Sequence, residues 1–123
     1  MDPVRVDETC DLVEPDQDGV ALVREHLLPA PMADRIAGSF WALADPTRVR
    51  IIHALTLAEL CNCDLAEVLG ISESAVSHQM RDLRLMNLVT AERRGRMVFY
   101  RLNDTHVRHI FEDSLRHVQE SPS

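Results

Sequence analysis

Two cysteines separated by a single residue, Cys61 and Cys63, are the first candidates for chemistry in this 123-residue chain, and the remaining cysteine is Cys10. Thiolates favour soft or borderline ions such as Cd(II), Pb(II), Zn(II), Cu(I) and trivalent arsenic. Two thiols cannot close a tetrahedral site, so Cys10 is the candidate for a third sulfur ligand. The alternative interpretation makes Cys61 and Cys63, hereafter the thiol pair, small residues at a helix junction. Three cysteines are too few and odd in number for a secreted disulfide framework.

A second group of ligand-type side chains brackets the C-terminal segment. Two histidines and two carboxylates form a tetrahedral set suited to Zn(II) or Co(II). These last-helix ligands are Asp104, His106, His117 and Glu120. His117 and Glu120 share one face of the expected helix over residues 104–120, because side chains three apart are neighbours. Taken singly, such histidines are also typical of a solvated helix face.

The last-helix ligands cannot meet within one chain. The thirteen residues from Asp104 to His117 span about 20 Å of helix. If the helix pairs antiparallel with that of a second copy, Asp104 and His106 of one subunit meet His117 and Glu120 of the other. The pattern therefore predicts a homodimer with two symmetric metal sites.

A helix-turn-helix pattern begins directly after the thiol pair. Residues 64–69 predict a short helix, Gly70-Ile71-Ser72 the tight turn, and residues 73–87 a second helix. Core-facing apolar residues follow helical spacing in this second helix. They are Val76, Met80 and Leu83. A polar stripe on another face has side chains that reach base edges, although such stripes are often merely solvated. It consists of Ser74, Ser77, His78 and Arg81.

A β-hairpin with a basic tip is expected next. Residues 88–92 and 97–102 are β-prone, and Arg93-Arg94-Gly95-Arg96 joins them. Arginines at such a tip would contact phosphates and add affinity with little sequence information. The chain carries a net charge of −7, yet residues 71–101 hold six arginines and three acidic residues. Phosphate binding needs only this local positive charge.

The remaining elements are expected to support these sites. Residues 1–18 predict a flexible acidic arm, and residues 19–123 one domain. Helices are expected over residues 20–28, 32–43 and 46–59, the last with Asp45 as N-cap and Pro46 in its first turn. We expect that third helix to bury Val49, Ile52, Leu55 and Leu57.

The fold class that follows is mainly α with a β-hairpin wing: a winged helix-turn-helix that dimerises through its N- and C-terminal helices. The last helix carries an apolar stripe that no later element covers, so a second copy is its expected partner. No apolar run approaches the roughly 18 residues of a membrane span, which predicts a cytoplasmic chain without membrane contact.

These motifs together resemble the ArsR/SmtB family of metal-responsive winged-helix repressors, over roughly residues 32–121. The resemblance rests on Ala44-Asp45-Pro46-Thr47-Arg48, Glu59 to Ala66 with its thiol pair, Ser72 to Gln79, the Arg94-Gly95-Arg96 wing, and the two ends of the last helix. The last-helix ligands match the zinc-sensing branch without departure. The thiol pair matches the cadmium- and lead-sensing branch, which typically supplies two ligands from its arm, whereas here the clear arm candidate is Cys10.

The resemblance implies a homodimeric repressor of a metal efflux or sequestration gene. The apo dimer would bind a pseudo-palindromic operator, and Zn(II), or alternatively Cd(II), Pb(II) or Co(II), would release it. The residues expected to contact DNA are Ser74, Ser77, His78, Gln79, Arg81, Arg93, Arg94 and Arg96. One alternative is a sensor of cadmium, lead or arsenite that uses Cys10 and the thiol pair. Another is a metal-buffering protein without operator specificity. An enzyme is not expected, because a closed four-ligand site leaves no open coordination position.

Overall fold

A computed structural model describes residues 14–120, which divide into two compact units with a boundary after Ala33. In the first unit, α1 (Gln17–His26) begins at Asp16, whose carboxylate accepts a hydrogen bond from the Asp18 amide. It begins three residues before the expected Val20. Helix α2 (Ala30–Leu43) also begins earlier than predicted and carries Pro31 in its first turn, where the missing N–H costs nothing. Cys10 and most of the predicted arm lie outside the described residues.

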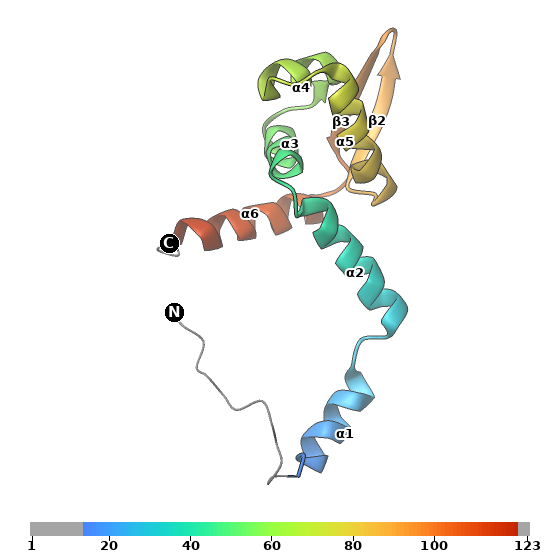
Figure 1. Cartoon of the computed structure of the whole chain (residues 1–123), viewed down its shortest axis with the longest axis vertical. Coiled ribbons are helices and arrows are strands. Elements are labelled where there is room, and N and C mark those ends of the chain that lie inside the picture. The colour runs from blue at the N-terminus through green and yellow to red at the C-terminus, as the bar shows by residue number, and fades with distance from the viewer. Residues whose placement is uncertain (1–13, 121–123) are drawn as a thin grey trace. The chain divides into compact units, whose positions relative to one another are not determined.

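Helices α3 (Pro46–Leu57), α4 (Asn62–Leu69) and α5 (Glu73–Leu85) form the centre of the second unit (Figure 1). The predicted start of α3 is confirmed, because the Asp45 carboxylate accepts from the Arg48 amide at 3.0 Å. Its predicted end at Glu59 is wrong. The helix stops at Leu57, and a two-residue strand, β1 (Leu60–Cys61), follows that the sequence pattern did not predict.

The wing is an antiparallel hairpin of β2 (Val89–Arg94) and β3 (Met97–Leu102), in a sheet of order β1-β3-β2. Arg94 pairs with Met97, so the connecting loop is Gly95-Arg96 and not the four residues expected. Gly95 adopts φ +64°, a left-handed conformation that glycine takes without steric cost. Figure 1 shows this hairpin standing beside α5.

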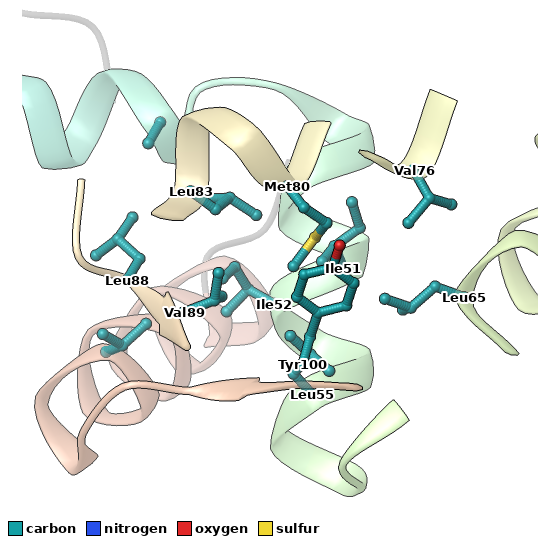
Figure 2. Packing of buried hydrophobic residues seen from close by; sticks show 12 residues of the cluster. Ile51, Ile52, Leu55, Leu65, Val76, Met80, Leu83, Leu88, Val89 and Tyr100 are labelled. Carbon is teal, nitrogen blue, oxygen red and sulfur yellow. The ribbon is translucent and has the colours of Figure 1, made fainter. Parts of the chain in front are cut away.

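The core lies where α3, α4, α5 and the sheet meet (Figure 2). Val76, Met80 and Leu83 are fully buried, as the helical spacing predicted. The expectation for α3 is partly wrong: Ile51 is fully buried, whereas Leu57 is 75% exposed. Tyr100 of β3 lies among the α3 and α5 side chains in Figure 2, and burial raises the pKa of its hydroxyl.

The last helix, α6 (Thr105–Glu120), packs on α3 and β3 through its first half. Asp104 caps it: one carboxylate oxygen accepts from the amides of His106 at 2.8 Å and Val107 at 3.3 Å. The Arg108 guanidinium donates to the Thr56 carbonyl at 2.8 Å and fastens α6 to the end of α3. Val107 is the only buried residue of the helix. Across the described residues, no helix is both long and apolar enough to cross a membrane.

Candidate functional site

The helix-turn-helix is formed by α4, a tight turn and α5. Gly70 ends α4 in the left-handed conformation at φ +69°, and its amide bonds back to the Ala66 and Glu67 carbonyls. The Ser72 hydroxyl accepts from the Ala75 amide at 3.0 Å and thereby caps α5. Since the buried face of α5 fixes its rotation, the opposite face is turned to solvent.

The polar stripe of Ser74, Ser77, His78 and Arg81 lies entirely on that exposed face. Its contact with bases stays a prediction. Gln79 differs from the stripe because it is partly buried, and its side-chain oxygen accepts from Nη1 of Arg48 at 3.2 Å. The structure therefore gives Gln79 a role in holding α5.

The three wing arginines are not equivalent. Arg94 forms ion pairs with Glu59 at 2.7 Å and Glu92 at 2.8 Å, and its guanidinium lies 4.4 Å from the centre of the Phe99 ring. Hydrogen bonds to Glu92 and then Glu59 raise the pKa of Arg94 further above its ordinary value. Arg93 and Arg96 are exposed, and neither has an ion-pair partner among the described residues. They are better placed than Arg94 to meet phosphate.

Arg48 connects two helices, a role that the sequence did not predict. Its guanidinium donates to the Ala42 carbonyl, to the Trp41 carbonyl at 3.2 Å and to Gln79. It also lies 4.8 Å from the centre of the Trp41 ring. One side chain thus joins the C-terminal end of α2 to the first half of α5.

Replacing Arg48 with Ala is expected to lower the free energy of unfolding by about 1–3 kcal/mol, because two backbone carbonyls and the Gln79 side chain lose a charged donor. Emission from Trp41, the only tryptophan, should change as the stacked guanidinium is lost. Urea unfolding followed by circular dichroism, together with native-state fluorescence, measures both effects. The matched control is Arg50→Ala, an exposed arginine on the same helix. Equal urea midpoints for the two variants would contradict this role for Arg48.

The thiol pair lies at the start of α4. Cys61 is buried and is the N-cap residue: its sulfur accepts from the Asp64 amide at 3.4 Å, and Asp64 Oδ2 accepts from the Cys61 amide at 3.4 Å. Burial, and next the hydrogen bond between the two thiols, raise the pKa of the Cys61 thiol to about 11. Cys63 is exposed, with its sulfur 2.8 Å from that of Cys61.

These donors are close enough to share an ion. Cys61, Cys63 and Asp64 offer ligand atoms within 4.8 Å of one another, and within residues 14–120 they are the one group of three ligand-type residues so close together. The role of the thiol pair as metal ligands stays a prediction, and Asp64 is a third donor beside it. Cys10, the predicted third sulfur ligand, lies outside the described residues.

Asn62, between the two thiols, is a functional candidate that the sequence pattern missed. Its side-chain nitrogen donates to Glu73 Oε1 at 2.7 Å, and its side-chain oxygen accepts from the Val98 amide at 3.3 Å. Glu73 is the first residue of α5, and Val98 belongs to the wing strand β3. Asn62 thus links the thiol pair to α5 and to the wing, the two elements that are expected to contact DNA.

The last-helix ligands are all exposed, and they occupy opposite ends of α6. Asp104 Oδ1 caps the helix and lies 3.4 Å from His106 Nδ1, so these two side chains are already adjacent. The hydrogen bond from the Val107 amide is the main cause that lowers the pKa of the Asp104 carboxyl. Imidazole and carboxylate donors suit Zn(II). Within one chain, however, each end of α6 carries only two of the four ligands.

Residues 45–91 match the family described as "Bacterial regulatory protein, arsR family". The transcriptional repressor SmtB homolog of Synechocystis sp. is 46% identical over 102 residues, which cover 83% of this chain and 77% of the relative. The cadmium resistance transcriptional regulatory protein CadC homolog of Staphylococcus aureus is 32% identical over 117 residues, covering 94% of this chain and 96% of the relative.

The fold has solved counterparts as well. A homodimeric winged helix-turn-helix DNA-binding domain from Mycobacterium bovis, solved in solution, superposes with a TM-score of 0.72 at 26% identity and covers 76% of this chain and 87% of that one. The fold and the sequence relatives lead to one conclusion: the chain belongs to the arsR family of bacterial regulatory proteins, with a winged helix-turn-helix fold, and is a transcriptional regulator rather than an enzyme.

Proposed function

We propose that the protein is a cytoplasmic metal-responsive repressor that binds operator DNA as an apo homodimer and releases it when Zn(II) binds. The regulated gene would encode metal efflux or sequestration. The observation that carries the proposal is the placement of the last-helix ligands. Asp104 and His106 lie at one end of α6, and His117 and Glu120 at the other, all exposed to solvent. The repressor and cadmium-resistance names of the relatives support the same class of function.

Exposed apolar surface supports a dimer. Beyond Val107, the apolar stripe of α6 includes Leu115 at 38% and Val118 at 67% exposure, and both line an apolar groove with Leu43 and Val49. Phe40 and Trp41 of α2 are also more than half exposed. An antiparallel pairing of two α6 helices would cover the stripe and complete two metal sites in one symmetric step.

The regulatory step follows from the dimer geometry. Two copies of α5 would enter successive major grooves of a pseudo-palindrome, about 34 Å apart. Zn(II) held between subunits would favour a dimer geometry in which the two α5 helices no longer match that spacing. DNA must then weaken zinc binding by the same factor that zinc weakens DNA binding.

A duplex selected from a random library for binding the apo protein provides the test, read by fluorescence anisotropy. Zn(II) should weaken wild-type binding by about tenfold or more. The His117→Ala variant should keep apo affinity and lose the zinc response. The matched control, His109→Ala, removes an exposed histidine of α6 outside the ligand set and should respond like wild type. A His117→Ala protein that releases DNA with zinc as wild type does would reject this regulatory site.

The second candidate function is a thiol sensor of Cd(II), Pb(II) or arsenite, favoured by the convergence of Cys61, Cys63 and Asp64. In that case arsenite or cadmium, and not zinc, would release the same duplex. Cys61→Ser would abolish the response while preserving the cap of α4, because serine is itself a strong N-cap residue.

A further inference from the structure

A third sulfur lies beside the thiol pair. Met97 is the first residue of β3, and its thioether sulfur is 4.0 Å from the sulfur of Cys63. Methionines usually fill gaps in cores, but Met97 is 42% exposed and lies outside the buried cluster. Sulfur atoms from three separate elements, β1, α4 and β3, therefore form a continuous row of contacts near the loop end of the wing, with Cys63 in the middle.

We propose that Cys61, Cys63 and Met97 form a three-sulfur site for a soft monovalent cation, Cu(I), with Ag(I) as its chemical analogue. Thiolate and thioether ligands select Cu(I), whereas carboxylate and imidazole suit harder ions. Binding would release one proton from each thiol and leave two thiolates and a neutral thioether around the cation. The site shares no residue with the last-helix ligands, so it goes beyond the proposed zinc response and does not require it.

The sulfur separations are compatible with a trigonal ion. With metal–sulfur bonds of about 2.3 Å, three sulfurs around one ion lie about 4.0 Å apart. The Cys63–Met97 separation already has this value, at 4.0 Å. The 2.8 Å separation within the thiol pair must widen, which the exposed Cys63 side chain achieves by rotating about its χ1 bond. The flexible, partly exposed Met97 side chain can follow this movement and keep its contact with Cys63.

The hard donor nearest the sulfurs is engaged elsewhere. Asp64 completes the capping box of α4, where its Oδ2 accepts from the Cys61 amide. A divalent ion that requires this carboxylate would compete with the cap, whereas a three-coordinate Cu(I) ion leaves it in place. Burial of Cys61 shields one side of the site from water.

The test compares Met97→Leu with wild type in anaerobic competition against a Cu(I) chelator. Loss of outer-shell partners alone costs metal sites 10–100-fold in affinity, so loss of a direct ligand should weaken Cu(I) binding at least about tenfold. Cd(II) affinity should change less than about twofold, because cadmium does not depend on the thioether. Met32→Leu, at a methionine of similar exposure (49%), should match wild type for both ions.

Two further measurements make the result decisive. In wild-type protein with 13C-labelled methionine methyl groups, Ag(I) should shift the Met97 signal and leave that of Met32 in place. The Cys10→Ser variant should retain wild-type Cu(I) affinity. The proposal is overturned if Met97→Leu binds Cu(I) like wild type, if the Met97 signal does not move, or if Cys10→Ser loses the ion. Zinc release of DNA, assayed separately in Met97→Leu, distinguishes failure here from failure of the zinc proposal.

Discussion

An equal mixture of His106→Ala and His117→Ala subunits is expected to bind zinc that neither variant binds alone. Each homodimer carries a damaged half in both of its shared sites. In a mixed dimer, one site combines the intact Asp104 and His106 of one subunit with the intact His117 and Glu120 of the other. Random subunit exchange makes half of the dimers mixed, so the mixture should hold about a quarter of the wild-type zinc at saturation.

The two histidines are replaced, and not Asp104, because of what each side chain does in the structure. His106 is 85% exposed in its side chain, so its replacement removes a ligand with little effect on folding. Asp104 is left in place because it caps α6, and its loss would mix helix destabilisation with ligand loss. A Cys61→Ser/Cys63→Ser background removes the thiol pair, so that the zinc counted is bound elsewhere.

A matched mixture provides the control. His117→Ala and Glu120→Ala damage the same half of the ligand set, so each site of their mixed dimer remains incomplete and no zinc should return. Zinc is measured by competition with a chromophoric chelator, and mixed dimers are counted by native mass spectrometry. If mixed dimers form and the first mixture still binds no zinc, the ligands are not shared between subunits.

The helix-turn-helix was predictable because its signals are local. In α5, Val76, Met80 and Leu83 repeat at helical spacing, and all three are fully buried. Gly70 and Ser72 are residues that end and begin helices for steric and hydrogen-bonding reasons. The α6 ligand set was predicted for a related reason, since ligand-type side chains at both ends of one helix can be recognised from sequence alone, and it stays a prediction.

What could not be predicted depends on contacts between distant parts of the chain. Strand β1 is two residues long and exists only through its pairing with Phe99 and Tyr100. The hydrogen bond from Arg48 to Gln79 joins residues 31 apart, and the contact of Cys63 with Met97 joins residues 34 apart. No local period encodes such pairs, so Arg94 was predicted to contact DNA although it is paired with Glu59 and Glu92.

Helix α3 shows that a helix can be predicted correctly from sequence while its buried face is not. Apolar residues occupy several faces of Pro46–Leu57, so helical spacing alone permits more than one core-facing set. Leu55 and Leu57 were both expected inside. The structure separates them, with Leu55 4% exposed and Leu57 75% exposed.

The Leu55→Ala variant is therefore expected to lose about 3 kcal/mol in the free energy of unfolding, within the range for buried leucines. Leu57→Ala should stay within about 0.5 kcal/mol of wild type, because the truncated side chain is already in water. Both are measured by urea unfolding with circular dichroism at one fixed protein concentration, since the stability of a dimer depends on concentration. Leu55 lies in the core cluster with Leu65 and Tyr100, so its truncation leaves a cavity where α3, α4 and the wing meet. Similar losses at the two positions would mean that Leu57 is covered in the assembled protein and that α3 presents a second buried face.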